Sequence, residues 1–216
     1  MTGKRSTGRV AAVFFLLCLL LAGCRRAEFA GIHRVAVLTP DNRTSSQELG
    51  IEIKHELLRV LPSRLAAEVI DGAAVEAELP AGEYAAGLQI PGVAVDLGAR
   101  YGVDAFLVGT VTDYREEAEE HFSLEAGTGE RMKAEIRVDL RVTLGFNLTL
   151  VRAADGAVVF SRYAWGSAVH PLSLGLIPPS ISLTVSAEPI YPRLRKEAIR
   201  DALQELLKEV ARSSGR

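Results

Sequence analysis

The run Ile136-Arg-Val-Asp-Leu-Arg-Val-Thr-Leu-Gly-Phe-Asn-Leu-Thr-Leu150 alternates apolar residues with polar or small ones over its whole length. A period of two is typical of a β-strand that buries one face against a core. The turn-forming pair Asp155-Gly156 follows, and Val158 to Ala168 then continues as a second apolar, β-branched segment. The sequence therefore predicts a long antiparallel hairpin with one buried face.

The segments upstream of this hairpin alternate between strand and helix patterns. Apolar, β-branched runs predict a strand at His33 to Leu38 and a short second strand at Ala66 to Ile70. Val93 to Tyr101 suits a helix that Gly102 ends in a left-handed turn, and Val103 to Thr112 is a mostly apolar strand. Such strand, helix, strand units imply an α/β layer.

Two further helices are expected to pack on this sheet. Leu49 to Leu61 keeps helical spacing, with Thr44 or Ser45 as the expected N-cap and Glu48 placed for a capping box. We therefore predict an α/β fold at 32–216, with a mixed sheet, a long antiparallel hairpin, helices packed on the sheet and a carboxyl-terminal helix. The apolar stripe of that last helix consists of Leu194, Ile199, Leu203, Leu206, Leu207 and Val210.

The amino-terminal 24 residues have the three parts of a secretion signal. Lys4, Arg5 and Arg9 form a positive front, Val10 to Leu21 is an apolar run, and Ala-Gly precedes Cys24. The ending Leu21-Ala-Gly-Cys24 resembles the lipobox of bacterial lipoproteins. That resemblance implies cleavage between Gly23 and Cys24 and attachment of acyl chains to Cys24.

A lipidated Cys24 would tether the protein to a membrane and not span it. Val10 to Leu21 is shorter than the roughly 20 residues that cross a bilayer as a helix. Several acyl chains on one residue give stable anchoring, since each buried methylene contributes about 0.8 kcal/mol. We expect a signal peptide at 1–23, a lipidated stem at 24–31 and one periplasmic domain at 32–216. In a two-membrane cell, Arg25 after the cysteine points to the outer membrane by the lipoprotein family's rule.

Composition excludes several other classes of function. Removal of the signal takes away three positive charges, so the formal net charge falls from −2 to −5. This balance argues against a nucleic-acid partner, which would require a basic face. Cys18 is lost with the signal and Cys24 carries the lipid, so no disulfide or cysteine metal site is expected within the mature chain.

No constellation of catalytic or metal-binding residues is recognisable. The histidines fall in separate elements without metal-ligand spacing, and the serines lack a Gly-x-Ser-x-Gly elbow. We therefore expect no enzyme activity, no metal and no cofactor. The four histidines are His33, His55, His121 and His170.

Three short stretches together resemble one family of bacterial envelope proteins. They are His33-Arg-Val-Ala-Val-Leu38, Leu97-Gly-Ala-Arg-Tyr-Gly-Val-Asp-Ala-Phe-Leu-Val-Gly-Thr-Val111 and Asp155-Gly-Ala-Val-Val-Phe-Ser161. The chain is similar here to periplasmic lipoproteins of the CsgG, LpoB and TolB amino-terminal-domain type, and the order of elements extends the likeness from about Ile32 to Val210. The resemblance implies a non-catalytic role as a secretion channel, an activator of peptidoglycan synthases or a partner in envelope assembly.

Two segments match the insertions that form membrane hairpins in the CsgG channel. Tyr114 to Glu135 is too charged for a lipid-facing strand, and its glutamates favour a solvated, mutually repelling loop over a cation site. Val169 to Ile190 alternates apolar and polar residues on both sides of Pro178-Pro179, but each arm has only about six to eight residues against the roughly 9–11 that cross a membrane. Three roles are open for its apolar side chains: they fill the core, they bind a partner, or they touch the membrane surface. These residues are Leu172, Leu174, Leu176, Ile181, Leu183 and Val185.

The leading hypothesis is a lipid-anchored periplasmic accessory or assembly protein that binds and positions a protein partner in envelope biogenesis or secretion. The alternative is a subunit of an oligomeric, CsgG-like outer-membrane secretion channel, which requires a homo-oligomer. An enzyme of unrecognised class is the third reading, for which no residue stands out.

Overall fold

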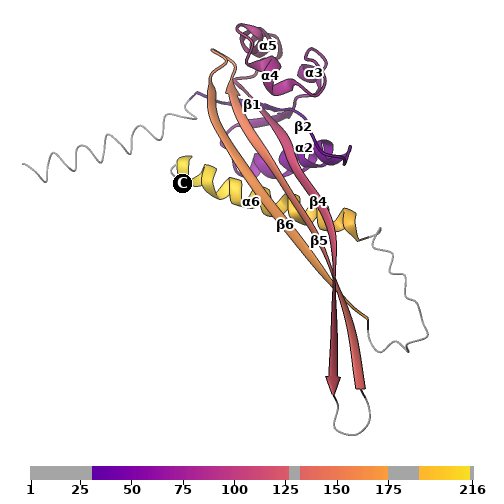
Figure 1. Ribbon diagram of the computed structural model, residues 1–216. Coiled ribbons are helices and arrows are strands. Elements are labelled where there is room, and N and C mark those ends of the chain that lie inside the picture. The colour runs from indigo at the N-terminus through magenta and orange to yellow at the C-terminus, as the bar shows by residue number, and fades with distance from the viewer. Residues whose placement is uncertain (1–30, 127–131, 175–189, 215–216) are drawn as a thin grey trace, which may run out of the picture.

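A computed structural model describes residues 31–126, 132–174 and 190–214, and Figure 1 shows its six-stranded sheet with helices on both faces. The lipobox residues Gly23 and Cys24 lie outside the described residues. The elements in chain order are β1 (Arg34–Val37), β2 (Asp41–Asn42), α2 (Leu49–Val60), a 3₁₀ turn (Leu61–Ser63), β3 (Glu68–Asp71), α3 (Ala73–Glu76), α4 (Tyr84–Leu88), α5 (Val93–Tyr101), β4 (Ala105–Ala126), β5 (Met132–Arg152), β6 (Val158–Leu174) and α6 (Tyr191–Ser214).

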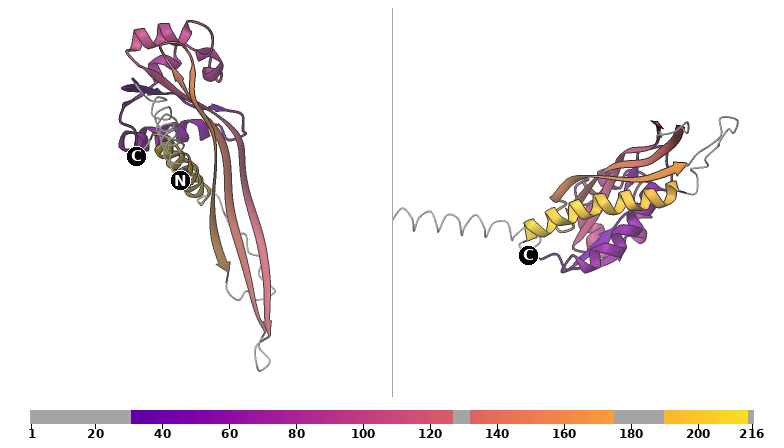
Figure 2. Two further views of the ribbon diagram at one scale, coloured as in Figure 1. Left: turned by 90° about the vertical axis from the view of Figure 1, so that its left-hand side faces the viewer. Right: turned by 90° about the horizontal axis from the view of Figure 1, so that it is seen from below.

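The sheet is mixed, as the sequence predicts. Its strand order is β3-β1-β4-β5-β6, and β2 pairs with β4 beside this path. β1 runs parallel to β3 and β4, whereas β4, β5 and β6 are antiparallel to their neighbours. The parallel part is covered on both faces, and the antiparallel part extends far beyond it as a long ribbon (Figure 2).

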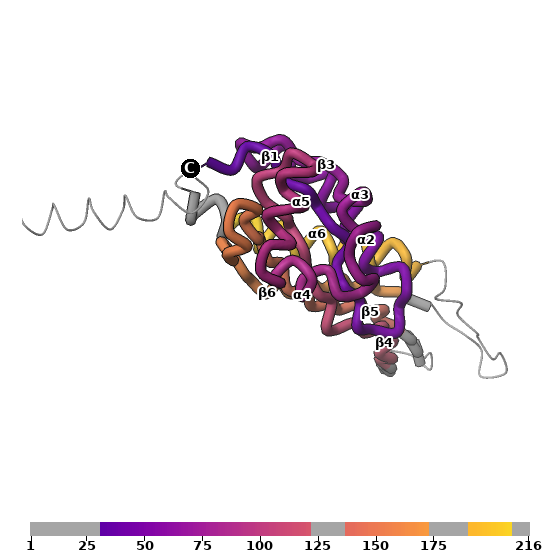
Figure 3. The backbone as a smooth tube through the Cα atoms, turned by 90° about the horizontal axis from the view of Figure 1, so that it is seen from above, coloured from indigo at the N-terminus to yellow at the C-terminus, as the bar shows by residue number. Residues whose placement is uncertain are grey.

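Two hydrophobic cores lie on opposite faces of the sheet. The apolar residues of the alternating run, from Leu140 to Leu150, face α2 and α6 and form the larger core with them. Phe106 and Val108 of β4 point to the other face, where they pack with α3, α4 and α5. Figure 3 looks down on these three helices, and Figure 1 shows that they lie at one end of the sheet. The predicted α/β fold with helices on the sheet is confirmed.

The passage from α5 into β4 forms as the sequence predicts. Gly102 ends α5 with a left-handed φ of 62°, a conformation that favours glycine. Asp104 then accepts hydrogen bonds from the backbone amides of His33 and Arg34, with its Oδ2 at 2.8 and 2.9 Å from the two nitrogens. This single carboxylate therefore joins the start of β1 to the start of β4.

The predicted capping box before α2 does not form. Glu48 itself occupies the N-cap and makes no side-chain capping bond. The Thr44 hydroxyl instead donates to Oδ1 of Asn42, which also accepts the Thr44 amide. An asparagine turn of this kind offers the backbone and the hydroxyl a local alternative to helix capping, and here it takes precedence.

The acidic segment after Thr112 is a strand and not the loop that its charge predicts. β4 continues to Ala126 and β5 begins at Met132, so the two strands pair far beyond the predicted end of β4. Exposed glutamates are tolerated because they lie at a solvated surface and Glu117 lies opposite Arg141. Long-range pairing with β5 thus outweighs the local repulsion.

The carboxyl-terminal helix α6 covers β5 and β6, as predicted, and approaches β6 very closely. A Cβ atom at Gly166 would overlap the backbone carbonyl oxygen of Ala198 and lie 2.8 Å from the backbone nitrogen of Ala202. The carboxylate of Asp201 also accepts a hydrogen bond of 3.2 Å from the amide of Ser167. No helix among the described residues is long and apolar enough to cross a bilayer.

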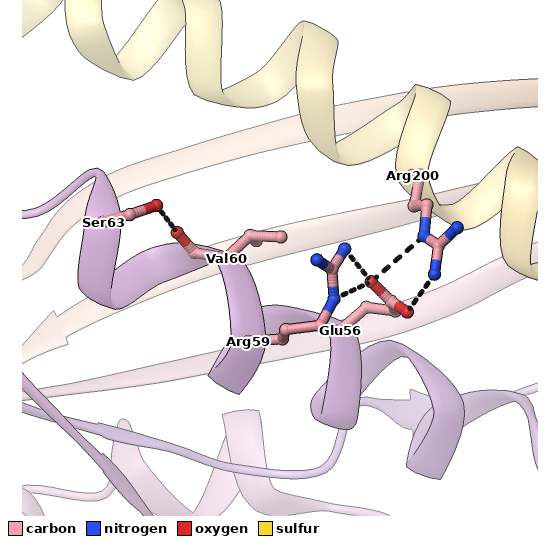
Figure 4. Close-up of polar contacts among 5 residues, drawn as sticks. All are labelled: Glu56, Arg59, Val60, Ser63 and Arg200. Carbon is pink, nitrogen blue, oxygen red and sulfur yellow. Dashed lines mark hydrogen bonds and ion pairs between the residues drawn. The ribbon is translucent and has the colours of Figure 1, made fainter.

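Ion pairs hold α6 against α2. Glu52 pairs with Arg195 at 3.1 Å, and Glu56 pairs with Arg200 of α6 and with Arg59 of its own helix (Figure 4). Partial burial raises the pKa of Glu56, but the hydrogen bonds from Arg59 and Arg200 outweigh it and lower the pKa below its usual value near 4.5. A lowered folded-state pKa means that the ionised Glu56 stabilises the fold at neutral pH.

We expect Glu56→Gln to reduce the free energy of unfolding by about 1 kcal/mol at pH 7, since it removes the negative charge from the hydrogen bonds with Arg59 and Arg200. The contribution of Glu56 is fully present above pH 4.5 and is lost as the pH falls through the lower folded-state pKa. The difference between wild type and variant should therefore shrink in urea titrations as the pH falls below about 4. Arg193→Gln, which breaks the exposed Arg193–Glu197 pair within α6, is the control and should change stability by less than about 0.5 kcal/mol. An undiminished Glu56→Gln difference at low pH would contradict the assignment.

Candidate functional site

The structure describes only part of the apolar segment that the sequence singles out. Leu172 lies in β6 and packs against the larger core, and Leu174 ends that strand opposite Ile136 of β5. Val169 to Leu174 thus forms the last part of β6 and pairs with β5. The remaining predicted positions lie outside the described residues: Leu176, Ile181, Leu183 and Val185.

A different surface of β6 collects exposed apolar side chains. Among the residues whose side chains the structure describes, seven large apolar side chains are exposed, and four of them belong to this one strand. Scattered exposed apolar residues are ordinary, but a concentration on one strand marks a candidate interaction surface. The four are Val158, Tyr163, Trp165 and Val169.

Tyr163 and Trp165 point to the same face of the sheet, away from α6. Ala164 and Gly166, which alternate with them, face α6 instead. The helices α3, α4 and α5 cover the other end of this outer face, and Tyr163 and Trp165 are 52% and 49% exposed. Trp165 is the only tryptophan of the chain, and about half of the surface of this residue is in contact with solvent.

Gly145 of β5 allows both aromatic rings to lie close to the sheet. Trp165 is its direct partner in the strand register. A Cβ atom at Gly145 would overlap the Tyr163 hydroxyl and lie 2.8 Å from Cε3 of Trp165. The rings therefore cover the glycine, an arrangement in which a cross-strand aromatic shields an otherwise bare strand position.

A β-bulge in β4 brings a carboxylate to the rings. The register with β5 shifts between Val111 and Asp113, so one extra residue, Thr112, is inserted. Because strand residues alternate between faces, this shift turns Asp113 to the outer face, opposite Gly145. The Tyr163 hydroxyl then reaches across β5 and donates to Oδ2 of Asp113 at 2.8 Å.

Hydrogen bonds keep this carboxylate ionised. The Thr112 hydroxyl donates to Asp113 at 2.7 Å, and this bond and that from Tyr163 lower the pKa of Asp113. The pKa of Tyr163 is raised, first by partial burial and also by the charge of Asp113. We call the four residues Asp113, Gly145, Tyr163 and Trp165 the aromatic platform.

Small polar side chains continue the outer face beside the aromatic platform. The amide nitrogen of Asn147 donates to the Ser161 hydroxyl at 3.2 Å, and that hydroxyl lies 3.0 Å from the hydroxyl of Thr149. The two aromatic rings are thus bordered by one ionised carboxylate, one amide and several hydroxyl groups. Such a set can accept and donate hydrogen bonds at the rim of an apolar surface.

The sequence patterns do not single out the aromatic platform. The pattern Tyr163-Ala-Trp165 within a predicted strand was the available signal, since alternate positions share a face. Asp113 gave no such signal, because its position opposite Gly145 depends on the bulge at Thr112.

A second polar cluster lies where β1 and β3 end, the edge at which α/β sheets commonly bind ligands. The buried amine of Lys54 contacts Asp71 at 2.6 Å and Glu76 at 2.8 Å, and Glu76 also accepts the Thr39 amide. Burial lowers the pKa of Lys54, but the hydrogen bonds with both carboxylates outweigh it and raise the pKa. Since these groups satisfy one another, the cluster is structural. Among the described residues, no three His, Cys, Asp or Glu side chains are arranged to hold a metal ion.

Comparisons with known proteins reveal remote likenesses only. No family model and no curated protein matches the chain. The lipoprotein GNA1162 from Neisseria meningitidis is 14% identical, with a TM-score of 0.46 over 83% of this chain and 99% of that one. The hypothetical protein CT253 from Chlamydia trachomatis is 15% identical, with a TM-score of 0.45 over 86% and 97%. The LpoB C-terminal domain from Salmonella enterica is 12% identical, with a TM-score of 0.39 over 63% and 85%.

Likenesses at these identities and TM-scores do not carry a function from those proteins to this chain. Function therefore has to be inferred from the chemistry of the site itself.

Proposed function

We propose that this chain is a lipid-anchored envelope protein, held at the outer membrane in a two-membrane cell, that works without catalysis by binding and positioning a partner. The observation that carries the proposal is the aromatic platform, where Tyr163 and Trp165 are half exposed on a sheet face that the described helices leave open. The lipobox at Leu21-Ala-Gly-Cys24 supports the anchor. A tethered domain that presents such a surface acts by recognition.

The length of β4 supports a role in presenting that surface away from the anchor. Six residues separate Cys24 from Gly31, and the seven steps between their Cα atoms can span at most about 25 Å. Asp104 binds the chain just after Gly31, so the described part of the chain begins beside the start of β4. Asp113 lies nine residues further along this strand, about 30 Å away at roughly 3.3 Å per residue.

A photo-crosslinking residue in place of Val169 tests the proposal in membrane-derived, full-length protein. Val169 is 45% exposed and lies four residues beyond Trp165 on the same face, so the substitution leaves the platform intact. We expect one specific adduct from this position, and we expect Trp165→Ala to abolish it. The matched control is Ile51, an exposed aliphatic residue of α2, which should give no adduct.

The mass of the adduct separates the outcomes. A product that contains another envelope component supports the proposed function. Equal labelling from Val169 and Ile51, or no adduct from Val169, would contradict it.

The open edges of the sheet favour a second candidate, a subunit of an oligomeric secretion channel. β6 is the last strand of the sheet, and β4 beyond Val111 pairs only with β5 among the described strands. Unpaired edges can add strands from neighbouring copies. In the same experiment, a ladder of crosslinked copies of this chain would support the channel subunit over the accessory protein.

A further inference from the structure

We infer that the aromatic platform is a glycan-binding site, at which sugar rings stack on Tyr163 and Trp165 while Asp113 accepts hydrogen bonds from their hydroxyl groups. This inference rests on the proposed function, because it names the chemical class of the envelope component that the surface binds. The ligand class is an uncharged pyranose polymer.

The two rings form a surface of the right kind for a sugar. Tyr163 and Trp165 are two positions apart on β6, which sets their backbones about 7 Å apart along the strand. Gly145 lets both rings lie against the sheet and still leaves about half of each side chain exposed. A pyranose has an apolar face of C–H groups, which packs on the face of an aromatic ring, and a rim of hydroxyl groups.

The polar neighbours match that rim. Asp113 is ionised and fixed by Thr112 and Tyr163, and a carboxylate held in place can accept two hydroxyl groups. Asn147 of β5 and Ser161 of β6 add a donor and an acceptor on the same face. The negative charge of Asp113 disfavours anionic sugars, so a neutral polymer is the better ligand.

The available apolar area favours a glycan over a protein partner. Aromatic side chains bury about 150–250 Å² each, so two half-exposed rings offer about 200 Å² in total. A stable protein interface buries about 800 Å² on each partner around a dry apolar centre. Here hydroxyl, amide and carboxylate groups border the rings. A protein or a second copy of the chain is the competing occupant.

Trp165 makes the test specific, because it is the only tryptophan of the chain and its fluorescence reports this place alone. The full-length protein in detergent is titrated with two probes, a tetramer of β-1,4-linked N-acetylglucosamine and cellotetraose. We expect a saturable change in emission with at least one probe, at a Kd of about 1 mM or tighter.

The variants separate binding at the platform from an unspecific effect. Asp113→Asn keeps the size of the side chain and should weaken binding about tenfold, because the charge-assisted hydrogen bonds are lost. Tyr163→Ala should weaken binding at least as much, with Trp165 still present as the reporter. The matched control is Glu117→Gln, which neutralises a carboxylate of the same strand and face opposite Arg141 and should leave Kd unchanged. Thermal melting of each variant verifies that the protein remains folded.

Failure of the glycan inference differs from failure of the proposed function. No saturation by either tetramer well above 1 mM, or equal Kd values for wild type, Asp113→Asn and Tyr163→Ala, would overturn the glycan inference. If Val169 still crosslinks to an envelope protein in a Trp165-dependent way, the proposed function stands with a protein as the partner. If neither saturable glycan binding nor the Trp165-dependent crosslink is observed, the glycan inference and the proposed function are both contradicted.

Discussion

Gly166→Val is expected to lower the free energy of unfolding by about 3 kcal/mol or more and to displace α6 from the sheet. A Cβ atom here would overlap the backbone carbonyl oxygen of Ala198, and it would lie 2.8 Å from the Cβ and the backbone nitrogen of Ala202. A single backbone atom of a helix cannot move away on its own, because it is held by the neighbouring peptide units. The whole helix therefore has to shift. Overpacking of this kind typically costs about 1–3 kcal/mol, and the loss of buried contacts of Ile199 and Leu203 adds to that.

Urea titrations of the detergent-solubilised protein, followed by circular dichroism, measure this change. Ser167→Val is the matched control, because it introduces the same side chain at the next residue of β6, which is exposed and faces away from α6. We expect it to change stability by less than about 0.5 kcal/mol. A Gly166→Val protein as stable as the control would show that α6 does not rest on β6 as described.

Cys24→Ala is expected to move the protein from the membrane fraction to the soluble fraction. The lipobox resemblance makes this cysteine the only attachment point, and each methylene of its acyl chains contributes about 0.8 kcal/mol to membrane binding. Loss of several chains therefore removes essentially all of the anchoring free energy. Fractionation of cells, followed by mass spectrometry of the purified protein, gives both the location and the lipid mass.

Cys18→Ala provides the control for the anchor. This residue is the only other cysteine and lies inside the apolar run of the predicted signal. The variant should keep the full lipid mass and remain in the membrane fraction. Membrane association that survives Cys24→Ala, or a lipid-free wild-type protein, would reject the anchor.

Local sequence patterns predicted most elements of the fold, but two local predictions failed, one because of a competing local turn and one because of long-range strand pairing. The alternating run, the Asp155-Gly156 turn and the helix that ends at Gly102 follow from side-chain periodicity and backbone conformation. The capping box at Glu48 did not form, and the Thr44 hydroxyl donates to Asn42 instead. The loop expected after Thr112 is part of β4, because pairing with β5 supplies hydrogen bonds that a local charge pattern cannot reveal.

The aromatic platform was the least predictable feature, since its parts come from three strands. Tyr163 and Trp165 were visible as alternate residues of one predicted strand, yet nothing in the sequence marks them as exposed. Their exposure depends on where α3, α4 and α5 stop on the outer face. The contact between Tyr163 and Asp113 depends on a bulge of one residue.

The amino-acid order alone was sufficient for most strand and helix periodicities and for the α/β class, because these follow from neighbours within a few residues along the chain. The signal and the lipobox stay predictions from the same kind of local pattern. The tertiary structure determined the length of β4, the close packing of α6 against Gly166 and the assembly of the aromatic platform. These features arise from contacts between residues tens of positions apart. Such contacts depend on strand register, in which a shift of one residue turns every side chain to the opposite face.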